Sequence, residues 1–213
     1  MSASPGLSRR GWLTSGFAAA VWGGAGGTGG VVVGAALPFC VWALDAPAPP
    51  EVLAALPQAR AAGHGRLRFM GLRVYDARLW VRAQDSAIAA NGADALADWS
   101  ALPLALEIRY LRELSGEQIA ERSLAEMRRQ GDINADTGQR WLTQMKTLFP
   151  DVKDGDRLTG VNQPGVGARF YLNGQRRGEV SEADFARRFF GIWLSPRSSE
   201  PQLRAALLGQ SRP

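Results

Sequence analysis

The sequence is poor in the side chains that most often carry metal and nucleophilic chemistry. It has one cysteine, Cys40, and one histidine, His64, among its 213 residues. A single cysteine excludes both a disulfide within the chain and a zinc site built from several cysteines. The histidine lies between two glycines and outside any motif, which is typical of a solvated turn residue. We therefore expect no cofactor and no metal site.

A strong charge imbalance and internal repeats are missing as well. The chain carries 25 basic and 20 acidic residues, for a net charge of +5. The arginines are scattered among Asp and Glu, whereas nucleic-acid binding proteins gather their basic residues on one face. Apolar residues make up 46% and charged residues 21%, which is close to the average of globular domains. The composition thus predicts one globular domain without a nucleic-acid partner.

The first residues have the pattern of an export signal. Residues 1–43 contain Arg9 and Arg10 but no acidic residue, and a long uncharged, glycine-rich run follows the two arginines. This pattern predicts a signal peptide over 1–43, and the paired arginines resemble the twin-arginine type. An uncleaved anchor is the alternative. In both cases we expect a periplasmic or otherwise exported domain that contacts the membrane only through an uncleaved signal segment. Residues 44–62, rich in Pro and Ala, are predicted to lead into a domain over 63–213.

Alternation of apolar and polar residues predicts the strands of a sheet. Gly71 separates two of the alternating segments, and Asn173-Gly174 is a strong signature of a hairpin turn. The Ala-rich segment from Asp85 to Trp99 is predicted to be a loop. The alternating segments are 66–69, 72–81, 103–111, 157–162, 168–172 and 175–180.

The helices are marked by capping residues and apolar stripes. Residues 115–118 form a capping box that opens a helix ending near Gln130. Asn134 is predicted to cap a second helix, which Pro150 ends, and Ser181 a third. A short last helix is expected over 201–208. Strands and helices cluster along the chain instead of alternating, which favours an α+β fold with an antiparallel sheet.

Five stretches resemble the chalcone isomerase-like family, especially its bacterial exported branch, and they occur in the family's order within residues 63–209. The resemblance implies an open-faced sandwich, in which a large antiparallel sheet carries a layer of helices on one face and a cleft lies between them. The stretches are GRLRFMGLRVYDARLW (65–80), ALEIRYLRELSGEQIAE (105–121), FPDVKDGDRLTG (149–160), FYLNGQRRGEV (170–180) and DFARRFFGIWLS (184–195).

The same resemblance identifies positions that matter in the plant isomerase, which closes a ring within a chalcone. In that enzyme an arginine, a threonine, a tyrosine and an asparagine line the cleft. The tyrosine and asparagine positions are Ile119 and Glu126 here, the threonine position is near Tyr75, and the best match for the arginine is Arg68. Ser181 stands near a further hydroxyl residue. Ile119 has no hydroxyl and Glu126 adds a charge, so the resemblance implies that the isomerase's catalytic groups are largely absent.

These positions give the candidate site. Arg68 and Tyr75 are the only candidate catalytic residues. The candidate ligand-binding residues are Arg68, Tyr75, Ile119, Ser123, Glu126 and Ser181. The aromatic residues Phe185, Phe189, Phe190 and Trp193 are expected in the core. Most Arg and Tyr side chains of the first hairpin and the next strand are expected on the solvent face of the sheet, with Arg68 and Tyr75 turned into the cleft; the set is Arg66, Arg68, Arg73, Tyr75, Arg78, Arg109 and Tyr110.

Three functions stay open at this point. The favoured one is a non-catalytic protein that holds a small amphipathic molecule, such as a fatty acid or an aromatic acid, in the cleft. The second is an isomerase or intramolecular lyase acting on another substrate. The third is an envelope scaffold that binds a partner protein, which exposure of Trp80, Trp99 or Trp193 in the folded domain would favour.

Overall fold

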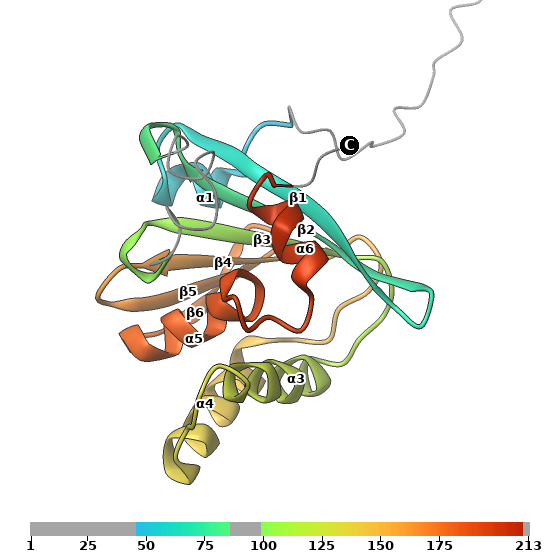
Figure 1. Cartoon of the computed structure of the whole chain (residues 1–213), viewed down its shortest axis with the longest axis vertical. Helices are drawn as coiled ribbons and strands as arrows, with labels where there is room; N and C mark the ends of the chain where they lie inside the picture. The colour runs from blue at the N-terminus through green and yellow to red at the C-terminus, as the bar shows by residue number, and fades with distance from the viewer. Residues whose placement is uncertain (1–45, 86–98, 211–213) are drawn as a thin grey trace, which may run out of the picture. The chain divides into compact units, whose positions relative to one another are not determined.

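The computed structural model describes residues 46–85 and 99–210 (Figure 1). All of the described residues belong to one compact unit. The predicted signal peptide, Cys40 and residues 86–98 of the predicted loop lie outside the described part.

A six-stranded antiparallel sheet organises the domain, and its strands lie side by side in the order of the chain. This arrangement, with helices that segregate from the strands, confirms the predicted α+β class. Each strand pairs with the next through a hairpin or a longer connection. The strands are β1 (Ala59–Phe69), β2 (Leu72–Arg82), β3 (Leu104–Tyr110), β4 (Arg157–Gln163), β5 (Gly167–Leu172) and β6 (Gln175–Val180).

The two turns predicted from glycine are present. Asn173 and Gly174 have φ values of 49° and 84°, and Met70 and Gly71 have 49° and 80°. Two consecutive residues with positive φ match the twist of the flanking strands, which is why such pairs close short hairpins. One prediction about β1 is wrong: His64 is not a turn residue but lies in the strand, half-buried and paired with Arg78. Its two glycine neighbours permit close packing there, because the backbone of α6 lies against Gly63.

The helices begin at the predicted capping residues with one exception. The Ser115 hydroxyl accepts the Gln118 amide at 3.2 Å, and the Asn134 side chain accepts the Thr137 amide at 2.8 Å. The third helix is preceded by Glu182, not Ser181, and has no side-chain cap. The helices are α1 (Pro50–Ala55), α3 (Gly116–Arg128), α4 (Ala135–Leu148), α5 (Ala183–Leu194) and α6 (Pro201–Leu207), with single 3-10 turns at Ala83–Asp85 and Trp99–Ala101.

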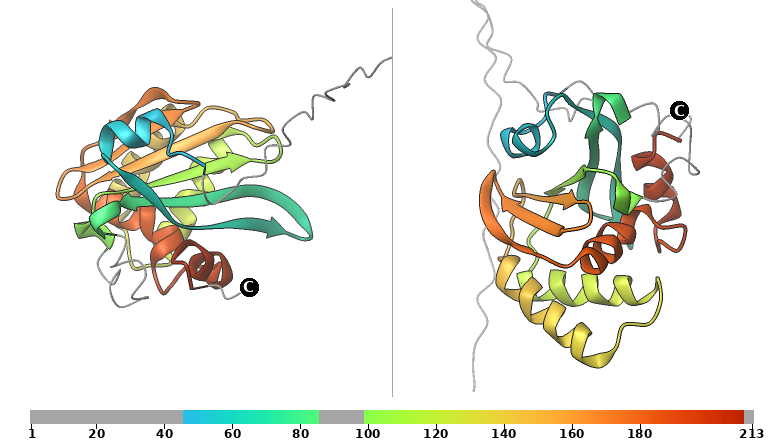
Figure 2. Two further views of the ribbon diagram at one scale, coloured as in Figure 1. Left: turned by 90° about the horizontal axis from the view of Figure 1, so that it is seen from above. Right: turned by 90° about the vertical axis from the view of Figure 1, so that its left-hand side faces the viewer.

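Both faces of the sheet are covered, but unequally. Helices α3, α4 and α5 form the layer on one face, α6 lies along β1, and the short α1 lies on the other face (Figures 1 and 2). The main core fills the space under the large layer. On the second face, Val52 and Leu56 pack against Trp80, Ala105 and Val161 in a smaller cluster. The segment predicted as a lead-in therefore contributes α1 and the start of β1 to the fold.

Arg78 belongs to the set of residues expected mostly on the solvent face, but it is buried. Arg78 is 1% exposed and Glu107, its partner in the β2–β3 ladder, is 3% exposed. Glu107 accepts a hydrogen bond from the Trp80 indole at 2.8 Å. Burial raises the pKa of Glu107, opposed by the Trp80 hydrogen bond and the positive charge of Arg157. The small cluster thus encloses charged groups that need each other to remain buried.

One contact ties α1 to this buried group. The Glu51 carboxylate, at the start of α1, accepts hydrogen bonds from the Arg157 guanidinium at 2.9 Å and from the Thr159 hydroxyl at 3.1 Å. The Glu51 side chain is 2% exposed. A carboxylate buried to this degree is stable only while its partners stay in place. Glu51 therefore fixes α1 on β4.

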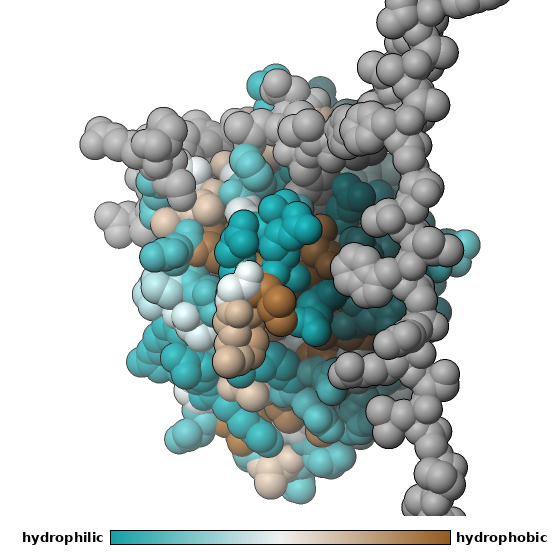
Figure 3. Space-filling view, turned by 90° about the vertical axis from the view of Figure 1, so that its right-hand side faces the viewer, coloured by the Kyte–Doolittle hydropathy of each residue, from teal (hydrophilic) through white to brown (hydrophobic). Residues whose placement is uncertain are grey.

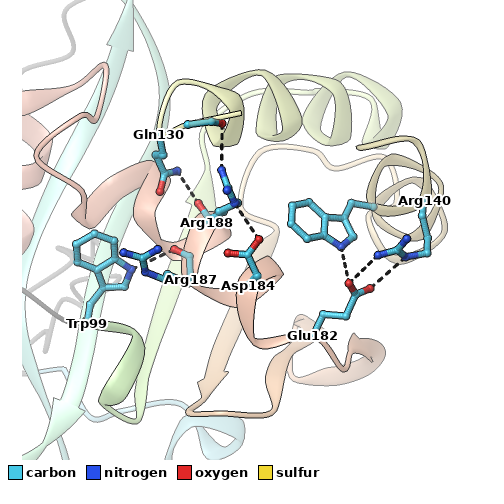
Figure 4. Close-up of polar contacts among 9 residues, drawn as sticks. Trp99, Gln130, Arg140, Glu182, Asp184, Arg187 and Arg188 are labelled. Carbon is cyan, nitrogen blue, oxygen red and sulfur yellow. Dashed lines mark hydrogen bonds and ion pairs between the residues drawn. The ribbon is translucent and has the colours of Figure 1, made fainter. Parts of the chain in front are cut away.

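Polar contacts hold the large helical layer together (Figure 4). The Glu182 carboxylate before α5 accepts hydrogen bonds from Arg140 at 2.8 Å and from the Trp141 indole at 3.1 Å, both of α4. The Gln130 amide after α3 donates to the Arg188 carbonyl at 2.6 Å. The Trp99 indole donates to the Arg187 carbonyl of α5 at 3.1 Å. These contacts fix α3, α4 and α5 relative to each other.

We expect Glu182→Ala to destabilise the domain by about 1 kcal/mol at pH 7, because the buried Trp141 indole loses its acceptor. Hydrogen bonds from Arg140 and Trp141 hold the pKa of Glu182 below its usual value, although partial burial acts the other way. A lowered folded-state pKa contributes stability that is complete above the unfolded-state pKa, about 4.3, and is lost as the pH falls through the folded value. Urea unfolding from pH 7 to pH 3 should show the two proteins converging at the acidic end. Glu113→Ala, at an exposed position, is the control, with a much smaller change expected.

Candidate functional site

The candidate site is a cavity of about 270 Å³ between the sheet and the layer of α3 and α5. Strands β1 to β4 provide its floor, and α3, α5 and the segment before α6 provide its walls. Most of the surrounding side chains are apolar, which is typical of ligand cavities. The lining residues are Leu67, Val74, Tyr75, Ile108, Tyr110, Leu114, Gln118, Ile119, Arg122, Ser123, Glu126, Phe149, Leu158, Phe189, Ile192, Trp193, Ser199 and Glu200.

Two tyrosines provide the polar groups on the floor. Tyr75 of β2 and Tyr110 of β3 are directly paired across the ladder, and their rings meet edge to face with centroids 6.2 Å apart. The Tyr75 hydroxyl accepts a hydrogen bond from the Trp193 indole of α5 at 2.9 Å. A phenol that accepts through its oxygen still has its own proton to donate. The Tyr75 hydroxyl can therefore donate to a ligand oxygen.

The environment keeps both phenols protonated. Burial raises the pKa of Tyr75 far above its usual value; the Trp193 hydrogen bond opposes this, and the negative charges of Glu200 and Glu126 add to it. Burial also raises the pKa of Tyr110, with a further contribution from Tyr75. At neutral pH both hydroxyls keep their protons, so each can donate a hydrogen bond and neither acts as a base. The floor of the cavity is thus suited to binding an oxygen atom.

One polar part of the cavity wall comes from one side of α3. Glu126 forms ion pairs with Arg122 at 2.6 Å and with Arg129 at 3.4 Å, one turn away on either side. The Glu126 side chain is 8% exposed, whereas that of Arg122 is 68% exposed. The Ser123 hydroxyl donates to the Ile119 carbonyl at 2.7 Å, which satisfies it within the helix. Arg122 is therefore the cation at the edge of the cavity.

The structure brings four of the six predicted ligand-binding residues together. Tyr75, Ile119, Ser123 and Glu126 all line the cavity. They come from β2 and from one stripe of α3, where spacings of three and four residues place side chains on the same face of a helix.

The other two predicted residues, Arg68 and Ser181, do not line the cavity. Arg68 is exposed near the end of the first hairpin, because alternation along β1 gives the inward position to Leu67. Ser181 is exposed after β6, the strand at the opposite edge of the sheet from β1. The structure therefore places these two residues apart from the four that share the cavity.

Several lining residues were missed by the sequence analysis. Tyr110 is not among the candidate site residues, although its spacing of two residues from Ile108 places both on the same face of the strand, which lines the cavity. Arg122 lies three residues after Ile119 and four before Glu126, a spacing that could have identified it. Phe189 and Trp193 were predicted as core residues, and both are buried and also line the cavity. Glu200 had no signature in its local sequence.

The comparison with protein families matches most of the described sequence to one family. The profile of the chalcone isomerase-like family matches residues 61–209. The chain therefore belongs to the chalcone isomerase-like family. An uncharacterized protein of Haemophilus influenzae is 33% identical over 110 residues, which is 52% of this chain and 54% of that protein, so the match spans about half of each.

A solved structure shares the fold. A fatty-acid binding protein of Arabidopsis thaliana superposes with a TM-score of 0.58 at 14% sequence identity, over 72% of this chain and 89% of that one. At this identity the likeness concerns the fold.

In the described residues, no three His, Cys, Asp or Glu side chains are grouped as a metal ion would require. The helices among residues 46–85 and 99–210 are too short or too polar to cross a membrane.

Proposed function

We propose that the protein is a non-catalytic binder of a small amphipathic molecule, such as a fatty acid or an aromatic acid. The observation that carries the proposal is the cavity itself, which is mostly apolar, with two protonated phenols on the floor and polar side chains of α3 and of the Ser199-Glu200 segment on its walls. Such a cavity matches a ligand with an apolar body and one polar end. The Arabidopsis neighbour is a fatty-acid binding protein, which gives this use of the fold a precedent.

The polar end of the ligand would be bound near Tyr75 and Tyr110. Both phenols can donate to a carboxylate or carbonyl oxygen. Arg122 can add a charge-assisted hydrogen bond to a carboxylate, because Glu126 keeps Arg129 as a second partner. A cavity of 150 Å³ holds benzene, so about 270 Å³ suits a chain of about ten carbons or a two-ring aromatic acid.

The groups around the cavity favour binding over isomerase chemistry. A general base works best when its pKa lies near the working pH. Burial raises the pKa of both phenols far above that range. Arg68, the candidate arginine, is exposed outside the cavity. Ile119 and Glu126 replace the plant enzyme's tyrosine and asparagine. We therefore favour the binder over the isomerase or lyase.

The scaffold alternative lacks the feature that would favour it. Trp80, Trp99 and Trp193 are 2%, 8% and 7% exposed, so none offers a large aromatic surface to a partner.

Export to the periplasm remains part of the proposal, on the pattern of residues 1–43. Cell fractionation with an antibody against the protein would test it, and a purely cytoplasmic protein would contradict it.

Tyr75→Phe is expected to weaken binding of decanoic acid about five- to tenfold, because one hydrogen bond to the ligand is lost while the aromatic ring is kept. The Trp193 indole also loses its acceptor, so thermal unfolding of the ligand-free variant is measured beside the titration. Isothermal titration calorimetry of the purified chain, delipidated beforehand, measures this loss; trans-cinnamic acid is the aromatic probe. Tyr171→Phe is the matched control, because Tyr171 packs against the cluster on the other face of the sheet. If neither acid binds the wild-type chain or raises its Tm, the proposed ligand class is wrong.

A further inference from the structure

The end of the β1–β2 hairpin exposes an unusual amount of apolar surface. Phe69, Met70 and Leu72 are 62%, 87% and 57% exposed. Met70 is in the Met70-Gly71 turn that joins β1 and β2, the two longest strands described, and Phe69 and Leu72 flank it. The hairpin extends beyond the neighbouring strands (Figure 1). Figure 3 looks at this side of the molecule and shows hydrophobic side chains bordered by hydrophilic ones. Apolar residues gathered at a projecting turn mark an interaction site more often than residues scattered singly.

Two arginines flank this apolar end. Arg68 and Arg73 are directly opposite each other in the ladder, and both are exposed. Like charges in opposite positions destabilise a strand pair, so this pairing has no benefit for the sheet. Arg66 lies two residues further from the turn along β1. It differs from these two arginines because the Asp76 carboxylate accepts its hydrogen bonds. Between Leu67 and Tyr75 the sequence has no acidic residue.

We propose that this hairpin end docks on an anionic lipid bilayer. Phe69, Met70 and Leu72 would enter the interface between headgroups and acyl chains, and the two arginines would bind lipid phosphates, the combination by which amphipathic elements bind membrane surfaces. A second copy of the chain is a poorer occupant, because a symmetric contact between two hairpin ends would bring four arginines together. Anionic headgroups complement the same charges.

The hairpin connects the docking surface to the cavity. Leu67, Val74 and Tyr75, directly behind the apolar end, line the cavity. Docking through the hairpin end would bring this side of the cavity near the interface, where amphipathic molecules partition. Exchange of ligand with the membrane at this point rests on the proposed function; the docking itself does not. Docking would add a second membrane contact to the one expected from an uncleaved signal segment.

A fluorescent probe at the turn tests the docking in the full chain. Met70→Cys in a Cys40→Ser background is labelled with an environment-sensitive nitrobenzoxadiazole dye. Vesicles of equimolar phosphatidylglycerol and phosphatidylcholine should shift its emission to the blue and increase it, and phosphatidylcholine vesicles should do so far less. Val166→Cys, in the exposed turn between β4 and β5, is the matched control and should show no shift. Because the probe reports on one residue, adsorption through residues 1–43 does not produce the expected result.

The charge requirement is tested by Arg68→Glu combined with Arg73→Glu. The labelled double variant should bind the anionic vesicles at least about tenfold more weakly, since each surface arginine contributes to attraction by anionic lipids. Absence of a shift at position 70, equal shifts at positions 70 and 166, or a shift that depends on protein concentration without vesicles would overturn the proposal. Loss of decanoic acid binding alone would sink the ligand proposal and leave the docking intact.

Discussion

Ile119→Trp is expected to weaken binding of decanoic acid about 100-fold while the domain stays folded. Ile119 is half-buried on α3 and projects into the cavity, so the larger indole would occupy space that the ligand needs. Excluding several methylene groups from an apolar site costs about 3 kcal/mol, which corresponds to an affinity loss of about 100-fold. The side chain extends into empty volume and not into a packed core, so the overpacking cost should stay near its lower limit of about 1 kcal/mol.

Calorimetric titration with decanoic acid measures the loss, and thermal unfolding shows whether the variant folds. Ala125→Trp is the matched control, because Ala125 lies on the exposed face of the same helix and does not line the cavity. It adds the same indole to α3 and should bind the acid as the wild type does. Unchanged affinity in folded Ile119→Trp would show that the ligand binds elsewhere.

Glu51→Ala is expected to destabilise the domain by about 2–3 kcal/mol. Removing one partner of a buried ion pair leaves the other without compensation, and Arg157 would be left facing Glu107 alone at 3.6 Å. Thr159, which is fully buried, would also lose its acceptor. The expected loss is below that of a fully enclosed pair because the Arg157 side chain is 30% exposed.

Urea unfolding at pH 7 provides the measurement, with Leu53→Ala as the control on the exposed face of α1. Glu51→Gln should lose less than Glu51→Ala, since the amide oxygen can still accept from Thr159. In a double-mutant cycle, adding Arg157→Ala should cost much less in the Glu51→Ala background than in the wild type. Additive losses would mean that the two residues act independently and that α1 is held by apolar contacts alone.

Local patterns in the sequence were sufficient for most of the secondary structure. The caps at Ser115 and Asn134 and the turns at Gly71 and Asn173-Gly174 involve hydrogen bonds and dihedral angles within a few residues. Such interactions are encoded where they occur, so they can be read without knowing the fold. The prediction failed at Ser181 because the neighbouring Glu182 is positioned by Arg140 and Trp141, residues that are distant in the chain.

The candidate site could be predicted only where helix and strand periodicity settle the direction of a side chain. Ile119, Ser123 and Glu126 share one stripe of α3, and that stripe faces the sheet. Arg68 lies outside the cavity. The resemblance fixed the position of the arginine only to within the hairpin, and a shift of one residue along a strand moves a side chain to the other face. The pairing of Tyr75 with Trp193, 118 residues apart, has no local signature.

The sequence by itself determined the α+β class, the family, the positions of most turns and caps, and the apolar faces of the helices. The tertiary structure alone decided that α1 covers the second face of the sheet, that Arg78 and Glu107 are buried there, and that Tyr110, Arg122 and Glu200 join one cavity. The physical reason is the separation along the chain of the residues that interact. Propensity, capping and periodicity act between neighbours in the chain, whereas burial and the pKa of a side chain depend on whatever the rest of the chain packs against it.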